Sequence, residues 1–551
     1  MLPVNDSRMT RRRFLSASAA AMGSAMVSPL AVGQQSAANG TFTWTLTSAG
    51  KNGKPDCIGD PVPVSIAIAA GQPIRTMQGG TGASFHAISA VLPGMRADGT
   101  SRSGSAWGGN PEADDDAHWN ELFQYADWLG LDWCRVEIEQ RMYEPEKRAF
   151  TWDNPEMRVL YRILDWAQRR GVDVFLQQMW ADVAWNAYPG NADDPTRRLR
   201  SAPYSIAEWA YGLGELLHQL VQVKGYTCIR WFSIVNEPGH DDFSWWQDSN
   251  MKSVSIVPGL QAARAEFDRR GIAVPISGPD WTDISDFKPA QVDFDQYIGA
   301  YDLHSYNSVF DSFDPMRGQT LSKTEQQMAD WAQWAHSKDK PFFLSEFGTM
   351  SYGWGHVDGG PACYQSGLKN ASLAVRGINV GVDGFNRWSF TNRGDLDGQW
   401  QLVRTWDVDR NRLLDKFTPQ PNAYYQYAML SRFLSKHSGV LATSVKAPFL
   451  PMDRKVVATA LRSPKGNLTI LVVNESYRAA DVSIDLENLS TQVQLHRYAV
   501  TPAIEGRCWV ELKAEQSGVV DGSMLDTIPP LGIVAYSTYL LNPQDDGIVS
   551  G

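Results

Sequence analysis

Two glutamates stand at the ends of hydrophobic segments and are the first candidates for chemistry. Residues 229–234 form a largely apolar run that leads into Glu237, and residues 341–345 lead into Glu346 in the same way. Desolvating a carboxylate costs several kcal/mol unless pairing offsets it, so a buried strand rarely ends on one for stability alone. Two carboxylates brought to one mouth by parallel strands are typical of glycosidic bond hydrolysis.

The chain between residues 78 and 436 predicts the elements that must position these glutamates. Short apolar runs alternate with amphipathic stretches, which indicates repeated βα units. The first strand is predicted to end near residues 79–82. The other seven are predicted at 133–139, 172–178, 229–234, 273–277, 301–306, 341–346 and 382–389. Helices are predicted at 119–129, 157–170, 260–270, 364–376 and 423–434, and two more open on the capping boxes Ser205–Glu208 and Ser322–Glu325. We therefore expect an α/β fold in which residues 76–437 form a (β/α)8 TIM barrel.

Three further segments flank this barrel. Residues 1–33 carry a twin arginine, Arg11–Arg12, before a short Ala-rich apolar stretch and a small-residue cleavage site. This pattern predicts a twin-arginine signal peptide and export to the periplasm or cell exterior. Residues 438–545 alternate like strands without helical periodicity, which predicts a C-terminal antiparallel β-sandwich. Residues 34–75 also predict strands, and whether these join the sandwich stays open.

The composition excludes some partners and favours another. A net charge of −11 argues against nucleic acid and against an anionic membrane surface, since both require a basic face. Twenty-one tryptophans provide flat apolar faces that suit sugar rings as well as protein cores. Five cysteines show no C-x-x-C spacing, and we expect Cys134 and Cys228 to be buried thiols in barrel strands.

The places of the two glutamates on this map carry a family resemblance. Active sites of TIM barrels lie at the carboxyl ends of the strands, and Glu237 and Glu346 end the predicted strands four and seven. The Asn-Glu-Pro motif at residues 236–238, with a glutamate at the end of strand seven, resembles the clan A retaining glycoside hydrolases. Further matches to the family 5 pattern are Arg135, His304, Tyr306 and Trp388. Residues 78–85 and 528–534 are more similar to families 30 and 39.

This resemblance implies a role for each residue. Glu237 is expected to be the general acid/base, with a pKa raised by burial, and Glu346 the nucleophile, kept ionised by Arg135 and Tyr306. The remaining expected roles are a contact of Asn236 with the sugar 2-hydroxyl, orientation of the network by His304, and stacking of Trp388 under the sugar. Weaker substrate-binding candidates at the same rim are Gln178, Trp180 and Glu137, because the histidine that family 5 has near strand three is not found here.

Each of these signals has a plainer explanation. Asn474–Glu475 repeats the Asn-Glu pair in the predicted sandwich, where we expect a turn. Tryptophans that could form sugar subsites but could equally pack in the core are Trp107, Trp185, Trp245, Trp246 and Trp354.

Motifs for cofactors are incomplete or missing. Residues 80–85 lack the third glycine of a dinucleotide fingerprint, and the sequence has no Walker loop and no H-E-x-x-H pair. Asp114–Asp116 with His118 fits no EF-hand loop, so we interpret it as a solvated charge run. We expect neither a cofactor nor a metal.

The function predicted from these residues is an exported retaining β-glycosidase that acts on a β-linked glucan, mannan or related oligo- or polysaccharide. Its substrate choice is expected to lie in the loops at 93–117, 239–254, 348–361 and 391–409. Arg197, Arg198 and Arg200 leave room for a uronic acid, although a solvated basic loop explains them as well. Two alternatives remain: a transglycosidase that uses the same residues, and a non-catalytic carbohydrate-binding barrel.

Overall fold

The computed structural model describes residues 31–32, 41–43, 46–47, 60–87, 109–238, 246–284, 287–306, 321–349, 361–392, 399–410, 412–447 and 456–541. The chain divides into a small unit, residues 1–34 with 46–56, and a large unit formed by the rest. In the small unit, β1 (Ala31–Val32) pairs antiparallel with β3 (Leu46–Thr47). No helix in the described ranges has the length and apolar character needed to cross a membrane. The predicted signal peptide otherwise lies outside the described residues.

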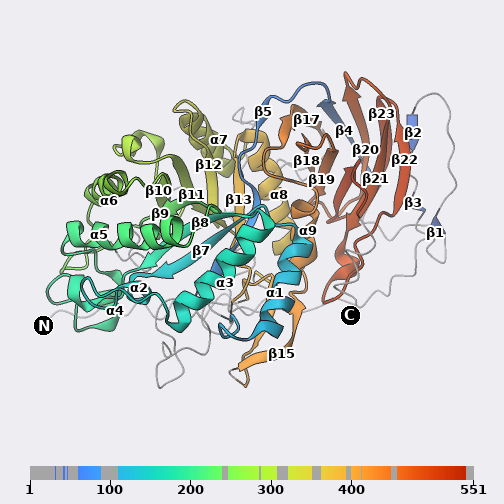
Figure 1. The fold of residues 1–551 in the computed structure, drawn as a ribbon. Coiled ribbons are helices and arrows are strands. Elements are labelled where there is room, and N and C mark those ends of the chain that lie inside the picture. The colour runs from blue at the N-terminus through green and yellow to red at the C-terminus, as the bar shows by residue number, and fades with distance from the viewer. Residues whose placement is uncertain are drawn as a thin grey trace, which may run out of the picture. The chain divides into compact units, whose positions relative to one another are not determined.

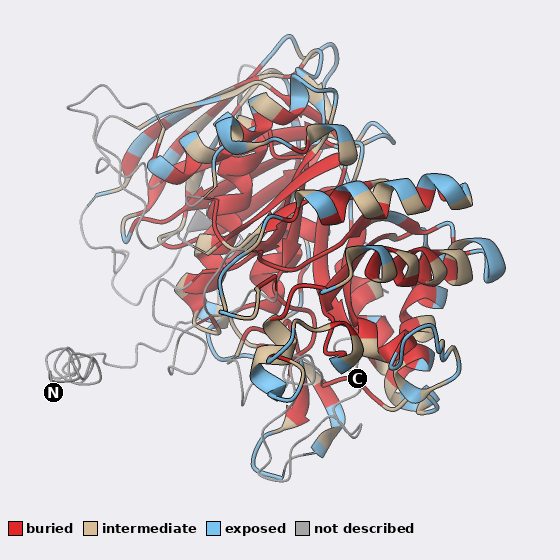
Figure 2. Cartoon of the chain, turned by 90° about the vertical axis from the view of Figure 1, so that its left-hand side faces the viewer, coloured by how far each residue is buried: buried red, intermediate tan, exposed pale blue. Residues whose placement is uncertain are grey.

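The large unit contains a closed barrel of eight parallel strands, which confirms the predicted TIM barrel (Figure 1). The strands are β6 (Gly80–His86), β7 (Trp133–Glu139), β8 (Asp173–Trp180), β9 (Ile229–Ser233), β10 (Ile276–Trp281), β11 (Ala300–Ser305), β12 (Phe342–Phe347) and β13 (Gly384–Arg387). The surrounding helices include α1 (Asp116–Leu129), α3 (Pro155–Arg170), α5 (Ile206–Leu217), α6 (Val257–Arg270), α7 (Lys323–His336), α8 (Tyr364–Val380) and α9 (Tyr424–Ser431). The shorter α2 (Gln140–Tyr143) and α4 (Pro195–Arg200) follow β7 and β8. Figure 2 shows the barrel strands buried and the outer helix faces exposed.

An aromatic layer fills the barrel interior. Trp133, Phe175, Ala300 and Phe343 pack together from four different strands, with Trp231 against them. Side chains alternate between the two faces of a strand, so the residue two positions beyond Trp133 faces the same interior one layer higher. That residue is Arg135, and the layer it starts is polar.

Two strand boundaries differ from those predicted. The first strand begins rather than ends at Gly80. Its glycines allow close packing, because a Cβ atom on Gly82 would lie 2.4 Å from the carbonyl oxygen of Trp133. Strand five begins at Ile276 and continues through Pro279 to Trp281, whereas the prediction ended it at Ser277. Proline can occupy a strand where its missing N–H is not needed, and this extension carries a further acidic residue to the mouth.

The predicted helix starts are largely present. Ser322 accepts a hydrogen bond from the N–H of Glu325, whose side chain in turn accepts from the N–H of Ser322 (2.9 Å), so this capping box is complete. Ser205 accepts from the N–H of Glu208, but the Glu208 carboxylate pairs with Arg148 (2.9 Å) instead of closing a box. The acidic run at residues 114–116 supplies the N-cap of α1 through Asp115.

Two antiparallel-rich sheets follow the barrel and confirm the predicted C-terminal β domain. Their bounds are β16 (Gly439–Leu441), β17 (Thr443–Lys446), β18 (Val456–Arg462), β19 (Leu468–Asn474), β20 (Ala480–Glu487), β21 (Val493–Val500), β22 (Gln516–Val520), β23 (Ser523–Ile528) and β24 (Ile533–Ser537). The N-terminal segment adds β2 (Thr41–Thr43), β4 (Val62–Ala69) and β5 (Arg75–Thr76) to these sheets. β4 pairs parallel with β20, and β2 pairs parallel with β23, in contrast to the other pairs of these two sheets. A hairpin of β14 (Val403–Asp407) and β15 (Arg412–Pro419) was not predicted; β14 lies in the predicted loop 391–409, and β15 follows it.

Glu475 joins the β domain to the barrel. It follows β19, as a turn residue would, but it is only 7% exposed. Its carboxylate accepts hydrogen bonds from Lys369, Ser372 and Arg376 of α8. The expectation of an ordinary turn was therefore incomplete, because the helix beside this turn supplies two cations.

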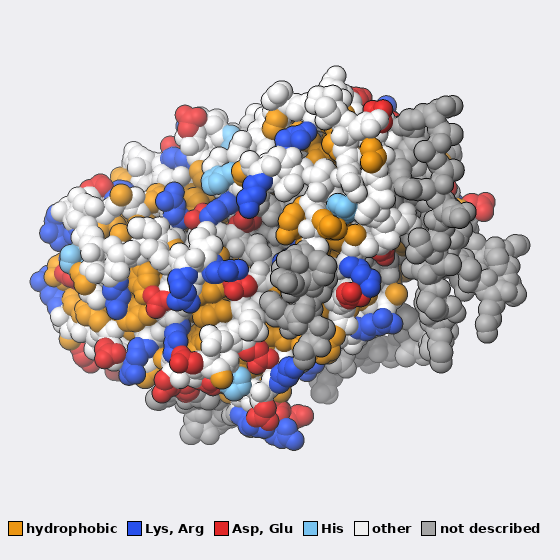
Figure 3. Space-filling view, turned by 45° about the vertical axis from the view of Figure 1, so that its right-hand side comes forward, with side chains coloured by type: hydrophobic (Ala, Val, Ile, Leu, Met, Phe, Trp, Pro, Cys, Tyr) orange, Lys and Arg blue, Asp and Glu red, His pale blue; other side chains and the backbone are white. Residues whose placement is uncertain are grey.

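Positively and negatively charged side chains are mixed on the face that Figure 3 shows, although the net charge of the chain is −11. The four cysteines in the described ranges, Cys134, Cys228, Cys363 and Cys508, are all free thiols. Cys134 and Cys228 are buried, as predicted.

Candidate active site

The structure brings the two predicted glutamates together at the carboxyl ends of the strands. Glu237 lies just beyond β9, and Glu346 lies on β12. His304 of β11 stands between them, with its Nδ1 2.7 Å from Oε1 of Glu237 and 3.4 Å from Oε2 of Glu346. A carboxylate oxygen of Glu237 lies within 4.8 Å of one of Glu346.

Arg135 provides positive charge beneath this pair. Its Nη1 lies 2.5 Å from Oε1 of Glu346 and also donates to Glu137, while its Nη2 donates to Oδ1 of Asn236 (2.6 Å). Burial alone would lower the pKa of Arg135, but the surrounding carboxylates outweigh burial and raise it. The guanidinium is therefore a permanent cation that Glu346 and Glu137 share.

Glu346 receives a second hydrogen bond from Tyr306, whose hydroxyl donates to Oε2 over 2.7 Å. Burial raises the pKa of Glu346 to about 7, helped by the charges of Glu237 and Glu137 and opposed by those of His304 and Arg135. The hydrogen bonds from Arg135 and Tyr306 favour the ionised carboxylate, so they limit an increase in pKa that burial alone would make larger.

Asp280 is a site residue that sequence reasoning missed. It is fully buried, and it lies 3.1 Å from Nε2 of His304 and 3.2 Å from Nη2 of Arg135, while the Ser345 hydroxyl donates to it over 3.1 Å. Burial acts to raise the pKa of Asp280, but Arg135 and His304 outweigh it and lower the pKa to about 2. Like Glu237, Asp280 is an acid near the carboxyl end of a strand, and the same pattern could have identified it. It was missed because strand five was predicted to end three residues earlier, at Ser277.

His304 links the carboxylates into one network. Burial would lower the pKa of His304, but the charges of Glu346 and Asp280 outweigh burial and raise it well above the usual value. A cationic imidazole donates from both nitrogens, from Nδ1 to Glu237 and from Nε2 to Asp280. This arrangement gives His304 the orienting position that the resemblance implied.

The backbone also holds the acids in place. Glu237 has φ +47° and Asp280 has φ +54°, so both lie in the left-handed region that non-glycine residues rarely adopt. The N–H of Glu237 donates to the carbonyl of Asp280 over 3.0 Å. Such conformations cost of order 1 kcal/mol each and persist where surrounding contacts fix them, as they do at many functional sites.

Of the other predicted residues, Trp388 and Trp180 lie at the carboxyl ends of strands, but Gln178 does not face the site. Trp388 lies just beyond β13, 5% exposed, and its ring meets the His86 ring edge-on with centroids 5.3 Å apart. Trp180 ends β8 and pairs with Glu139 in register. Gln178 is not brought to the site, because it pairs with Ile138 on the outer face and accepts from the Tyr143 hydroxyl (3.1 Å).

Gln177 occupies the inward position that was predicted for Gln178. It pairs with Glu137 in register, and Arg135 pairs with Phe175 of the interior layer. Alternation along β8 therefore turns residues 175 and 177 inward and Gln178 outward.

The rim candidates have varied outcomes. Trp246 is 1% exposed and packs edge-on against Trp209, so it is a core residue rather than a sugar platform. Trp185 donates to the carbonyl of Glu144 (3.2 Å). Trp107, Trp245 and Trp354, and most of the loop residues predicted to select the substrate, lie outside the described residues. Among the three arginines after strand three, Arg198 pairs with Asp182 over 2.9 Å.

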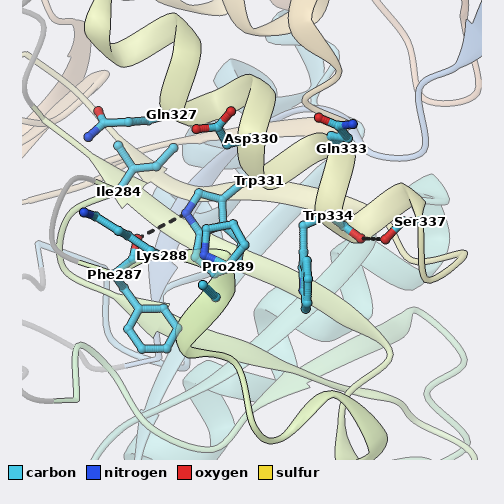
Figure 4. A pocket seen from close by; sticks show the side chains of 11 residues that line it. Ile284, Phe287, Lys288, Pro289, Gln327, Asp330, Trp331, Gln333, Trp334 and Ser337 are labelled. Atoms are coloured by element: carbon cyan, nitrogen blue, oxygen red, sulfur yellow. Dashed lines mark hydrogen bonds between the residues drawn. The ribbon is translucent and has the colours of Figure 1, made fainter.

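A pocket lies on the flank of the barrel, between α7 and the connection from β10 to β11 (Figure 4). It has a volume of about 480 Å³, and Trp331, Trp334, Phe287 and Asp330 help to line it. Lys338 stands over the Trp334 ring at 5.0 Å, and the Trp331 indole donates to the carbonyl of Phe287 (3.3 Å). Its lining contains no pair of facing carboxylates, so we assign the chemistry to the barrel mouth.

The donor atoms of Glu237, His304 and Glu346 are close enough together to hold a cation. Both nitrogens of His304 already face carboxylates, and Arg135 supplies positive charge to Glu346. These contacts leave the imidazole no free lone pair for a metal while it is cationic. Independence from metals remains a prediction.

Comparison with known families agrees with this geometry. The family model for cellulase (glycosyl hydrolase family 5) matches residues 88–374, more than half of the chain. The match includes Glu237 and Glu346 and leaves Trp388 outside. No curated protein matches the sequence.

Solved structures show the same fold at low sequence identity. The family 30 subfamily 8 xylanase Xyn30A from Clostridium acetobutylicum aligns with TM-score 0.55 and 15% identity over 86% of this chain and 99% of its own. SrfJ from Salmonella typhimurium aligns with TM-score 0.57 and 13% identity over 89% and 94%. The endo-β1,6-glucanase BT3312 aligns with TM-score 0.54 and 13% identity over 88% and 96%. The resemblance to clan A, with features of families 5 and 30, is therefore confirmed.

Proposed function

Because the chain belongs to the cellulase family, glycosyl hydrolase family 5, we propose that it is a retaining β-glycosidase that hydrolyses a β-linked glucan, mannan or related glycan. The observation that carries the proposal is the short approach of Glu237 and Glu346, whose nearest carboxylate oxygens lie within 4.8 Å. Retaining glycosidases hold their two carboxyl groups about 5 to 5.5 Å apart, whereas inverting enzymes need about 6.5 to 9.5 Å to admit a water.

The contacts of each glutamate suggest its role. Glu346 receives hydrogen bonds from Arg135 and Tyr306, which suit a carboxylate that attacks the anomeric carbon and forms a glycosyl-enzyme. Glu237 accepts its hydrogen bond from the His304 imidazole over 2.7 Å. It protonates the leaving oxygen in the first step and removes a proton from water in the second.

Asn236 lies between these residues and the sugar. Its Oδ1 accepts from Arg135, which leaves its amide N–H groups for the substrate. A hydrogen bond from this amide to the sugar 2-hydroxyl strengthens as positive charge develops on the ring. Trp388 forms one wall of the subsite and offers its ring face to the sugar.

The nature of the glycan is argued from charge and from similar proteins. The net charge of −11 does not favour a polyanionic substrate at long range. One structural neighbour is a xylanase and another an endo-β1,6-glucanase, which favours a β-linked polysaccharide. We further propose export through the twin-arginine pathway, which is supported by Arg11 and Arg12 before a short apolar segment. Replacing both arginines with lysine is expected to retain the protein inside the cell, as fractionation would show.

The function is tested with aryl β-glycosides and with neutral β-glucans, mannans and xylans beside glucuronate-bearing polymers. We expect hydrolysis of a neutral β-glycan and a first product of retained configuration by NMR. An inverted first product contradicts the retaining mechanism. Preference for an acidic polymer, lost when Arg197, Arg198 and Arg200 are replaced, contradicts the neutral-glycan assignment. Transfer to sugar acceptors in place of hydrolysis identifies a transglycosidase.

A further inference from the structure

A histidine and glutamate pair stands beside the catalytic carboxylates without a role in the mechanism above. His86 ends β6 and pairs in register with Glu137 of β7, so both side chains face the barrel interior with Arg135. Nδ1 of His86 lies 2.6 Å from Oε2 of Glu137, whose other oxygen accepts from Arg135. His86 is thus connected to Glu346 through Glu137 and the shared guanidinium.

The far edge of the His86 ring is unsatisfied. Nε2 is buried, and no residue in the described part of the chain lies within hydrogen-bond distance of it. Buried polar atoms are nearly always hydrogen-bonded, and one left without a partner costs about 1 to 3 kcal/mol. The ring as a whole is 1% exposed and contacts Trp388 edge-on. An unsatisfied atom in this place calls for a partner that arrives with the substrate.

Glu137 decides what this atom can do. A carboxylate only accepts, so the short contact places a proton on Nδ1 and leaves Nε2 as the ring nitrogen open to a further hydrogen bond. Arg135 holds Glu137 from its other side, which fixes the orientation of the imidazole. Nε2 therefore stands at a fixed position on the wall that His86 and Trp388 share.

We propose that His86 is a substrate-binding residue whose Nε2 forms a hydrogen bond with a hydroxyl of the glycosyl unit that is transferred to Glu346. This inference rests on the proposed glycosidase function and deepens it. Asn236, Arg135 and Glu346 form one part of the site, and Glu137 separates His86 from Glu346. The hydroxyl is therefore one of those remote from the anomeric carbon, and His86 selects sugars that carry it in the correct orientation.

The test compares two substitutions that imitate opposite edges of the ring. His86→Asn places an amide N–H near the position of Nδ1, so it keeps the contact with Glu137 but has nothing at Nε2. His86→Gln reaches the position of Nε2 with an amide oxygen and abandons Glu137. kcat/KM is measured for both variants and the wild type on the best aryl β-glycoside and on its 3-deoxy, 4-deoxy and 6-deoxy analogues.

We expect the wild type to lose about 10- to 100-fold in kcat/KM on one deoxy analogue, the usual effect of leaving a polar group of the site unpaired. His86→Asn is expected to lose about as much on the parent substrate and less than about threefold more on that analogue. His86→Gln is expected to keep more activity on the parent than His86→Asn does. His496→Asn serves as the matched control, because Nδ1 of His496 contacts the Ser517 hydroxyl between β21 and β22 of the β domain, and it should behave as wild type.

A purely structural role gives a different pattern. If His86 only supports Glu137, His86→Asn stays close to wild type and His86→Gln is the weaker enzyme, and either result overturns the inference. Equal losses on the parent and on every deoxy analogue also overturn it. Failure of the wild type to hydrolyse any β-glycoside rejects the proposed function itself, and the deoxy series then has no reaction to report.

Discussion

Asp280 and Glu237 approach His304 from opposite edges of its ring, with Asp280 3.1 Å from Nε2 and Glu237 2.7 Å from Nδ1. A second bond joins the two acids directly, because the N–H of Glu237 donates to the carbonyl of Asp280. Asp280 therefore fixes both the backbone of the expected acid/base and the histidine that contacts it. This acid lies too deep to touch substrate and acts through its neighbours.

Asp280→Asn is expected to lower kcat by about 100-fold while KM changes little, because the amide keeps the shape but removes one of the two main charges that raise the pKa of His304. Ser345→Ala is the graded comparison and should cost about fivefold or less, since it removes one neutral hydrogen-bond donor. Steady-state kinetics check both values, and NMR titration of His304 should show a lower pKa in Asp280→Asn. A kcat loss without any change in that titration argues against the assigned role.

Glu346→Ala is expected to reduce turnover by at least about 10⁴-fold, because the residue that would form the glycosyl-enzyme is gone. Azide can occupy the space left by the carboxylate and attack directly. We expect azide to restore part of the rate on an activated aryl glycoside and to give a glycosyl azide of inverted configuration. Product NMR reads this outcome, and an azide-independent residual rate speaks against Glu346 as the nucleophile.

Glu237→Ala should separate substrates by their leaving groups. A dinitrophenolate needs no protonation to depart, whereas a sugar alcohol does. The variant is therefore expected to keep most of the wild-type glycosylation rate on dinitrophenyl glycosides and to lose about 10³-fold or more on natural glycosides. Equal losses on both substrates would remove Glu237 from the acid role.

Periodicity predicted the barrel and the ends of its strands well enough to place its two glutamates. Glu237 and Glu346 were found because each lies near a strand end that periodicity could locate, whereas Arg135, His304 and Tyr306 were identified through the resemblance to family 5. Asp280 was missed because strand five was predicted to end at Ser277, three residues before it. Gln178 was chosen over Gln177 because the face of a wholly buried strand cannot be read from its apolar pattern. Asn236 came with the Asn-Glu-Pro motif.

The partners of buried charges were the least predictable feature. The Lys369 ammonium and the Arg376 guanidinium that contact Glu475 come from α8, about 100 residues earlier in the chain. No residue near Glu475 in the sequence indicates these contacts. The same holds for His86 and Glu137, which become neighbours only when β6 and β7 pair. Tertiary pairing sets these contacts, and a single sequence contains no local signal for it.

The activity of the free enzyme should show an acid limb near pH 7. Burial raises the pKa of Glu346 to about 7, and the nucleophile must be ionised, so kcat/KM is expected to fall as pH drops below that value. Glu237→Gln removes a like charge that contributes to the increase. The acid limb should therefore move to lower pH in that variant when it is measured on a dinitrophenyl glycoside. An acid limb at pH 4 to 5 in the wild type, or an upward movement in the variant, contradicts this account.

Glu475 is expected to stabilise the protein without affecting catalysis. Its carboxylate is buried against Arg376 and Lys369, and these cations outweigh burial and lower its pKa. Glu475→Gln leaves Lys369 without its counterion, while Arg376 keeps its ion pair with Glu325, and should reduce the free energy of unfolding by about 3 kcal/mol, measured with urea at pH 7. Glu511→Gln, which breaks the exposed pair with Lys513, should cost less than about 0.5 kcal/mol.

The pH dependence of this effect follows from the direction of the pKa shift. A carboxyl group with a lowered folded-state pKa contributes its full stabilisation above the unfolded value of about 4.3, and the contribution disappears as pH falls through the folded value. The difference in unfolding free energy between wild type and Glu475→Gln should therefore be largest at neutral pH and shrink below about pH 4. An unchanged kcat/KM at 25 °C in Glu475→Gln would show that the ion pairs of Glu475 stabilise the protein without affecting catalysis. A difference in unfolding free energy that grows on acidification excludes the ionic contribution of Glu475.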